Sequence, residues 1–325
     1  MKRPLSVGVW TFGMGSERYV DKGYKPYLAF DERVKRIAEL PGVSGIELTF
    51  PGDVNAHNLN LVKSMLGSYG LQVAALGVEL VCDAEWQTGS FASDDPERRQ
   101  RAITLTKEGM EVAQALGVDV VSLWLGQDGF DYVFQADYAR AWRSLVTGIK
   151  ECAEFLPRVK LAIEYKTSEP KMMCYVNSGG KALALAQATG CENVGVNLDI
   201  GHAFIGRENP AEVASVLLSE NRLFHLHLND NYGIADDDMP VGAVHWPQLI
   251  ELFYRLESLA YAGWYSLDLY PYRDDSWEAC AASITFIQQV CDLVEDPSFA
   301  EELHKQQGGA PSKVLHWLYK KALMH

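Results

Sequence analysis

The chain has 325 residues, of which 48% are hydrophobic and 22% are charged, a composition typical of globular proteins that bury a large core. Its formal net charge of −14, from 43 acidic and 29 basic residues, argues against a protein that binds the nucleic-acid backbone, because such binding depends on Lys and Arg. The balance favours a small neutral or cationic partner, and part of the excess acid is expected to bind metal.

Short apolar runs typical of buried strands recur along the chain. They span residues 5–12, 43–50, 71–80, 118–125, 159–164, 194–199, 223–228 and 263–269. Helical patterns fill the gaps, for example at residues 95–116, 136–155, 210–218 and 276–294. The first of these helices has clear signals at both ends, since Asp94 or Asp95 with Pro96 suits a helix start and Gly117 suits a stop.

Eight strands that alternate with helices predict a parallel sheet. The number eight, without a glycine-rich dinucleotide turn, favours a closed (β/α)8 TIM barrel over a doubly wound sheet. We assign residues 1–294 to this α/β barrel and residues 295–325 to a short C-terminal helical extension. The extension is expected to contain a loop at 306–311 and an amphipathic helix at 313–324. That helix either covers the barrel's own surface or reaches onto a neighbouring subunit.

Acidic residues and a histidine stand at the C-terminal ends of four consecutive predicted strands. They are Glu164, Asp199, His227 and Asp268. Active sites of TIM barrels lie at this end of the strands, and imidazole combined with carboxylates suits a hard or borderline divalent cation. His225 shares a strand face with His227. The two histidines could instead form a packed, hydrogen-bonded pair.

The remaining composition predicts a cytoplasmic protein. The six cysteines are scattered and form no CxxC pair, which favours reduced thiols over a disulfide framework. No stretch approaches the roughly 20 apolar residues of a membrane span, and the first apolar run is too short and broken for a signal peptide. We therefore expect neither a membrane nor a nucleic acid as a partner.

Several motifs, in chain order, resemble those of the xylose isomerase-like sugar isomerases. They are residues 9–11 (VWT), 89–99 (GSFASDDPERR), 123–129 (LWLGQDG), 162–171 (AIEYKTSEPK), 199–202 (DIGH), 236–238 (DDD) and Asp268 with its trailing segment. The resemblance covers most of the barrel, from Trp10 to about Ile287. It implies an aldose–ketose isomerase that acts on an open-chain sugar by a metal-assisted hydride shift.

The resemblance also implies one or two divalent cations per chain, with Mn²⁺ favoured and Mg²⁺, Co²⁺ or Zn²⁺ as alternatives. Glu164, Asp199, His227 and Asp268 would hold the first cation. Asp199 would bridge to a second, completed by His202, Asp236 and Asp238. The use of His227 and Asp199 at these positions is closer to L-rhamnose isomerase than to xylose isomerase. Asp237 is interpreted as solvated, and His225 as a residue that orients a neighbour.

Other residues are candidates for contact with the substrate. Lys166, assigned with Glu164 and Asp268 as catalytic, can hydrogen-bond the substrate's carbonyl oxygen, or can form a salt bridge to a nearby carboxylate. Trp10 and Trp124 could wall an apolar side of the pocket or belong to the barrel core, and His202 is expected to lie beside the sugar. A homo-oligomer, either a dimer or a tetramer, is expected.

The chain departs from the xylose isomerase pattern at the second strand. That family has a histidine there that is linked to sugar ring opening, whereas this chain has none at residues 49–53; His57, further on, is either a substitute or an exposed loop residue. We therefore expect an unusual, short or branched sugar that opens readily.

Other enzymes of this fold remain alternatives. A ketose 3-epimerase is the first of them, although such enzymes carry paired glutamates and an arginine after the metal-binding histidine, and no Arg occurs between Arg222 and Arg255. An inosose-dehydratase-like lyase is another. A related apurinic-site endonuclease is disfavoured by the acidic balance, and a catalytically inactive sugar-binding barrel by the complete set of metal ligands.

Overall fold

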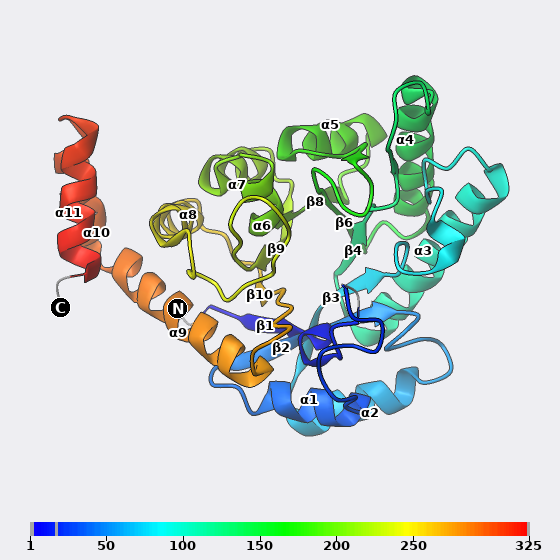
Figure 1. Cartoon of the computed structure of the whole chain (residues 1–325), viewed down its shortest axis with the longest axis horizontal. Helices are drawn as coiled ribbons and strands as arrows, with labels where there is room; N and C mark the ends of the chain where they lie inside the picture. The colour runs from blue at the N-terminus through cyan, green and yellow to red at the C-terminus, as the bar shows by residue number, and fades with distance from the viewer. Residues whose placement is uncertain (1–2, 17–18, 324–325) are drawn as a thin grey trace.

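A closed barrel of eight parallel strands forms the centre of the molecule, with helices packed around its outside (Figure 1). The computed structural model describes residues 3–16 and 19–323. In spatial order the barrel strands are β1 (Leu5–Gly8), β10 (Tyr265–Leu267), β9 (Leu223–Leu228), β8 (Val194–Asp199), β6 (Lys160–Glu164), β4 (Val120–Trp124), β3 (Gln72–Val78) and β2 (Val43–Phe50). The predicted (β/α)8 TIM barrel is confirmed.

The surrounding helices follow the barrel strands in turn, so that all but the last separate successive strands. They are α1 (Phe30–Ala38), α2 (Leu59–Tyr69), α3 (Pro96–Leu116), α4 (Tyr138–Phe155), α5 (Gly179–Thr189), α7 (Pro210–Ser219), α8 (Trp246–Ser258) and α9 (Ser276–Glu295). The start of α3 follows the sequence prediction, because the Asp95 carboxylate accepts a hydrogen bond from the Glu97 amide at 2.9 Å. The end of α3 also follows the prediction, since Gly117 has φ = +79°, a conformation that glycine adopts without a Cβ clash.

Two local features differ from the predicted elements. The first strand ends at Gly8, and residues 9–12 form a 3₁₀ turn, η1 (Val9–Phe12), rather than a continuation of the strand. A small antiparallel sheet of β5 (Gly129–Phe130) and β7 (Met173–Cys174) was not predicted. Each of these strands has two residues, which is too short to show an alternating pattern. They follow β4 and β6, so this small sheet lies beyond the strand ends that carry Trp124 and Glu164.

The tail contains two helices, α10 (Pro297–Gln307) and α11 (Pro311–Leu323), which stand to one side of the barrel (Figure 1). Helix α10 was not predicted, although Asp296 accepts from the Ser298 amide at 2.8 Å and Pro297 occupies the first turn. The predicted helix at 313–324 begins earlier, at Pro311, and Met324 lies outside the described residues. Tyr319 of α11 approaches Trp246 of α8, with ring centroids 6.2 Å apart, so the tail contacts the chain's own barrel.

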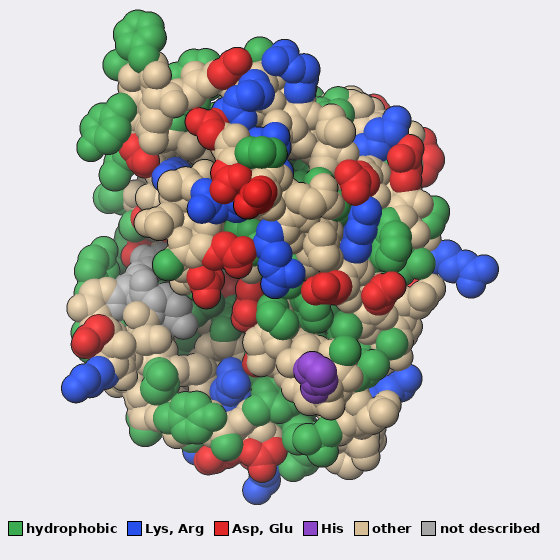
Figure 2. Space-filling model, turned by 90° about the vertical axis from the view of Figure 1, so that its right-hand side faces the viewer, with side chains coloured by type: hydrophobic (Ala, Val, Ile, Leu, Met, Phe, Trp, Pro, Cys, Tyr) green, Lys and Arg blue, Asp and Glu red, His purple; other side chains and the backbone are tan. Residues whose placement is uncertain are grey.

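Surface and thiol features agree with the composition. All six cysteines are free, as their scattered positions predict. Among residues 3–16 and 19–323, no helix combines the length and the apolar character that a membrane crossing requires. Acidic and basic side chains are interspersed on the face of the molecule shown in Figure 2.

Candidate active site

The four residues predicted at the strand ends come together at one end of the barrel. Glu164 and Asp199 are the last residues of β6 and β8, His227 lies near the end of β9, and Asp268 follows β10 directly. One ligand atom from each of the four lies within 4.8 Å of the others. The three residues on the strands are buried. Their convergence follows from the parallel barrel, in which all strands end on the same side.

His227 Nδ1 faces the three carboxylates of this group. It lies 3.1 Å from Asp268 Oδ2, 3.5 Å from Glu164 Oε1 and 3.7 Å from Asp199 Oδ2. The strand register produces this arrangement, because Asp199 of β8 and Ser266 of β10 both pair with His227 of β9. Asp268 therefore stands two residues beyond the level of His227.

The residues predicted to hold a second cation form an adjoining buried group. The short helix α6 (Ile200–Ile205) follows β8, and the Asp199 carboxylate caps it by accepting from the His202 amide at 3.0 Å. The His202 ring then connects the two groups, because its Nδ1 lies 3.6 Å from Glu164 Oε1 and its Nε2 lies 3.0 Å from Asp236 Oδ2. Asp238 is also buried. Within the described chain, His202, Asp236 and Asp238 do not converge as the first four residues do.

Lys166 is one of the most enclosed charges of the site. Its Nζ lies 2.7 Å from Asp236 Oδ2 and 3.1 Å from Glu169 Oε2, and the side chain is 5% exposed. The same Nζ lies 5.1 Å from the centre of the Trp124 ring, within the range of a cation–π interaction. The alternative predicted for Lys166, a salt bridge to a nearby carboxylate, therefore forms with Asp236 and Glu169. Trp124 lies beside the Lys166 ammonium.

Trp10 contacts the metal-ligand group directly. Its Nε1 donates a hydrogen bond to Asp268 Oδ1 at 2.7 Å, and its ring lies edge-on to His227 with centroids 6.5 Å apart. The hydrogen bond leaves Oδ2 of Asp268 turned toward His227 Nδ1. Trp10 therefore orients a candidate ligand, a role that the sequence did not suggest. His57, in contrast, lies on an exposed loop.

Several acidic side chains are buried close together at this site, and they shift one another's pKa values. Burial, together with Asp236, Asp268 and Glu164, raises the pKa of Asp199 to about 7 even though His202 acts to lower it. Burial alone would lower the pKa of His202, but Asp199 and Asp236 outweigh it and raise this pKa to about 9. The pKa of Asp238 is also raised, first by burial and then by Asp236 and Asp268. The group carries more negative charge than its own cations neutralise.

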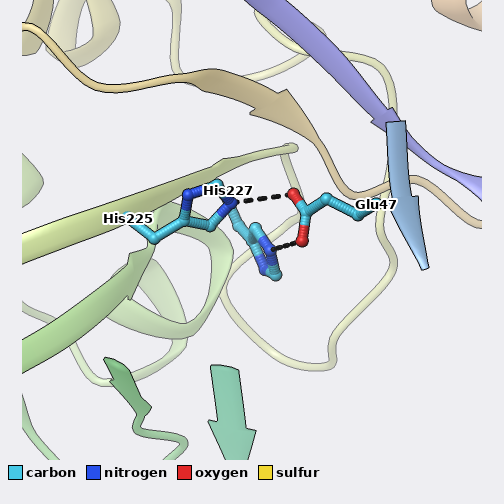
Figure 3. A group of neighbouring side chains, drawn as sticks. All are labelled: Glu47, His225 and His227. Carbon is cyan, nitrogen blue, oxygen red and sulfur yellow. Dashed lines mark hydrogen bonds and ion pairs between the residues drawn. The ribbon is translucent and has the colours of Figure 1, made fainter. Parts of the chain in front are cut away.

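A further buried acid, Glu47 on β2, was not predicted; it is 1% exposed. Its carboxylate faces both histidines of β9, with Oε1 2.8 Å from His225 Nε2 and Oε2 3.1 Å from His227 Nε2 (Figure 3). Burial would raise the pKa of Glu47, but these histidines outweigh it and hold the pKa well below its usual range. A signal was present, because a single Glu within the apolar run at 43–50 would point into the barrel.

Asn197 of β8 is a second residue that the sequence analysis missed. It has no ionisable group, and it lies within an apolar run, so nothing in the pattern distinguished it. Its Nδ2 lies 3.0 Å from Glu164 Oε2 and 3.3 Å from each ring nitrogen of His227. Asn197 thus contacts two of the candidate ligands, Glu164 and His227.

The donor set fits a divalent cation. Three carboxylates and an imidazole supply the oxygen and nitrogen atoms that Mn²⁺, Mg²⁺, Co²⁺ or Zn²⁺ accept. Two buried atoms of the adjoining group, His202 Nδ1 and Asp236 Oδ1, make no hydrogen bond, whereas buried polar atoms in proteins are almost always paired. A positive ion would neutralise the excess carboxylate charge, which buried sites otherwise tolerate poorly.

Comparison with known proteins identifies the family. The sequence model for the xylose isomerase-like TIM barrel matches residues 34–290. The chain belongs to this family. The resemblance inferred from the motifs is thereby confirmed.

Solved structures share the fold. A D-tagatose 3-epimerase-like protein has a TM-score of 0.69 and 17% identity, with 89% of this chain and 98% of that chain covered. For D-psicose 3-epimerase from Clostridium cellulolyticum H10 the values are 0.70 and 16%, with 89% and 99% covered. A xylose isomerase domain protein from Alicyclobacillus acidocaldarius gives 0.66 and 16%, with 90% and 99% covered. At these identities the likeness concerns the fold.

Proposed function

We propose that the protein is a metal-dependent aldose–ketose isomerase that acts on an open-chain sugar by a hydride shift. The main support is the position of the Lys166–Asp236–His202 group, which adjoins the four candidate ligands through the 3.6 Å approach of His202 to Glu164. In this reaction negative charge develops on two adjacent sugar oxygens, O1 and O2. The proposed cation at the four ligands and the Lys166–Asp236–His202 group beside it would supply two neighbouring positions that stabilise this charge.

Glu164, Asp199, His227 and Asp268 would hold the first cation, with Mn²⁺ as our choice. His202, Asp236 and Asp238 would complete a second position next to Asp199. A bound divalent cation supplies Lewis-acid polarisation of the sugar oxygens. Since Asp236 Oδ2 already contacts both Lys166 and His202, we infer that the second position forms only when this ion pair rearranges.

Lys166 acts in this proposal as a donor and not as a base. Burial would lower its pKa, but Asp236 and Asp238 outweigh it and keep this pKa above the usual range. The ammonium therefore stays protonated and can donate a hydrogen bond to the carbonyl oxygen as negative charge develops there. Trp124, which lies against the ammonium, and Trp10 would limit the access of water.

The positions of the carboxylates support a hydride shift rather than proton transfer. Glu164 and Asp268 both point into the ligand group, so neither is free to act as a base on the sugar carbon while a cation is bound. The isomerisation moves a hydride between C2 and C1 and a proton between O2 and O1. Atoms and electrons balance within the sugar, and no oxidant or other reactant is needed.

A ketose 3-epimerase is the second candidate. It is favoured by the structural relatives, since those named for D-tagatose, D-psicose and L-ribulose are 3-epimerases. Such a reaction exchanges a proton at C3. It needs a carboxylate that acts as a base on C3, either after release from the metal or while still bound to it. The shorter Asp268, which the Trp10 hydrogen bond holds in place, makes this harder than a longer glutamate would.

Product analysis after reaction in deuterium oxide decides between the two candidates. A panel of aldoses and ketoses with Mn²⁺, Mg²⁺ or Co²⁺ would first identify a substrate. We expect little or no deuterium at carbon in the product, as measured by NMR and mass spectrometry, because a migrating hydride does not exchange with solvent. Deuterium at C1 or C2 would indicate proton transfer instead, and deuterium at C3 would establish the epimerase.

We further infer that the protein works in the cytoplasm as a homo-oligomer. The six free thiols support the first point, because reduced cysteines are typical of that compartment. Leu315 and Tyr319 on α11 support the second, since each is nearly half exposed. The division at residue 294 also remains a prediction.

A further inference from the structure

The Glu47 carboxylate shares His227 with the candidate metal site, but from the opposite side of the ring. His227 Nε2 lies 3.1 Å from Glu47 Oε2. The other ring nitrogen, Nδ1, faces Asp268, Glu164 and Asp199. Figure 3 shows the Glu47 side chain reaching from β2 toward both imidazoles of β9.

Elementary hydrogen-bond chemistry places a proton on Nε2 of each histidine in this arrangement. An ionised carboxylate only accepts hydrogen bonds, so each histidine must donate its Nε2–H to Glu47. A neutral imidazole carries one proton. If that proton is on Nε2 of His227, the lone pair of Nδ1 is directed at the three carboxylates that would surround a cation.

We propose that Glu47 is a positioning residue that holds His227 in the Nε2–H tautomer and thereby makes Nδ1 a metal ligand. This inference rests on the proposed cation site. Metal-binding histidines commonly donate their second N–H to a carboxylate, which fixes the ring and increases the basicity of the ligating nitrogen.

Glu47 is itself held by residues from three other strands. Ser266 of β10 donates to Oε1 of Glu47, and Ser6 of β1 donates to Ser266 at 2.7 Å. His225 contacts the same oxygen, Oε1, at 2.8 Å. Two donors therefore converge on Oε1, and within residues 3–16 and 19–323 the hydrogen bond at Oε2 comes from His227.

The same geometry argues against Glu47, His225 and His227 as a separate metal site, although they lie close enough together. The oxygen Oε1 already accepts from His225 and Ser266, which leaves little space for an ion on that side. A cation bound by His227 Nε2 would also place the ring proton on Nδ1, and that nitrogen could then not bind the cation proposed among the three carboxylates.

Glu47→Gln tests the proposal with a nearly isosteric side chain. The glutamine carbonyl is expected to remain where His225 and Ser266 both donate, which turns its NH₂ group toward His227 Nε2. That nitrogen must then accept, so the His227 proton moves to Nδ1 and competes with the cation. We expect a 10- to 100-fold increase in the Kd for Mn²⁺ or Co²⁺, the usual effect of losing such a partner.

The tautomer is measured separately, by NMR of ¹⁵N-histidine-labelled protein with and without Mg²⁺ or Zn²⁺, with assignment through a His225→Gln variant. In the wild-type protein we expect Nε2 of His227 to be protonated and Nδ1 to shift on metal addition. This measurement stands even if Glu47→Gln does not fold. Protonated Nδ1 in the metal-loaded protein, or Nε2 as the ligating atom, would overturn the proposal.

Glu79→Gln is the matched control for the affinity measurement. Glu79 is exposed just beyond β3 and accepts from Thr49 Oγ1 at 2.7 Å, so the variant makes the same charge change away from the histidines. It should leave the metal Kd unchanged. Equal Kd values for wild type and Glu47→Gln would refute the role of Glu47 alone. No metal binding by the wild-type protein would instead refute the proposed function.

Discussion

Lys166→Met is expected to keep the fold and the bound metal but to lower kcat by roughly 10²- to 10³-fold, the scale of one lost transition-state donor. Methionine retains much of the apolar stem of lysine but cannot donate to the developing oxyanion. Asp236 loses its ammonium partner, but the His202 contact at 3.0 Å remains. The measurements are kcat on the best sugar of the panel, metal content and the melting curve.

Lys171→Met provides the matched control for this variant. Lys171 lies on the same loop and is ion-paired with Asp131 at 3.3 Å, with 14% of its side chain exposed, but it has no contact with the candidate ligands among the described interactions. Its kcat should remain close to that of the wild type. Loss of both metal and fold in Lys166→Met would show that the ion pair with Asp236 is structural.

Metal removal is expected to lower the melting temperature by roughly 4 °C. A cation at about 100 times its Kd adds about 2.7 kcal/mol to the stability of the folded state, and about 1 kcal/mol corresponds to one or two degrees for a chain of this length. The reason is structural, since the four ligands connect β6, β8, β9 and the segment after β10. Thermal melts after EDTA treatment and after return of Mn²⁺ measure the effect.

Two carboxylate variants make this measurement specific. Asp199→Asn removes a charge from the first ligand group and should abolish the response to Mn²⁺. Asp237→Asn removes a charge between Asp236 and Asp238 but from a partly exposed side chain, so it should respond as the wild type does. An unchanged melt in the wild-type protein, together with no metal by elemental analysis, would contradict the metal site.

The sequence predicted the barrel and the rim for a common reason. In a closed parallel barrel the strand ends share one side, so a polar residue at the end of each apolar run is sufficient to place Glu164, Asp199 and Asp268 together. Contacts between side chains inside the barrel produce no such pattern in the sequence. Glu47 and His227 are 180 positions apart, and which inward-facing residues meet depends on strand stagger and tilt.

The contacts at the second proposed cation position could not be predicted for a different reason. Residues 236–238 lie in a long loop between β9 and α8, where no repeating pattern fixes the direction of a side chain. Asp236 and Asp238 turn inward while Asp237 does not, and Asp238 has φ = +46°. The local ion pair of Lys166 with Asp236 depends on this loop conformation, so the residue types could be predicted but not their pairing.

The hydrogen bond from Trp10 to Asp268 can form only late in the synthesis of the chain. It joins positions 258 residues apart, so nearly the whole chain must leave the ribosome before the partner of Trp10 exists. Contacts of such long range form late, because the ends of a large loop must first meet. If Glu164, Asp199, His227 and Asp268 bind a cation as proposed, the complete set of four ligands would exist only after the segment that follows β10 has been made.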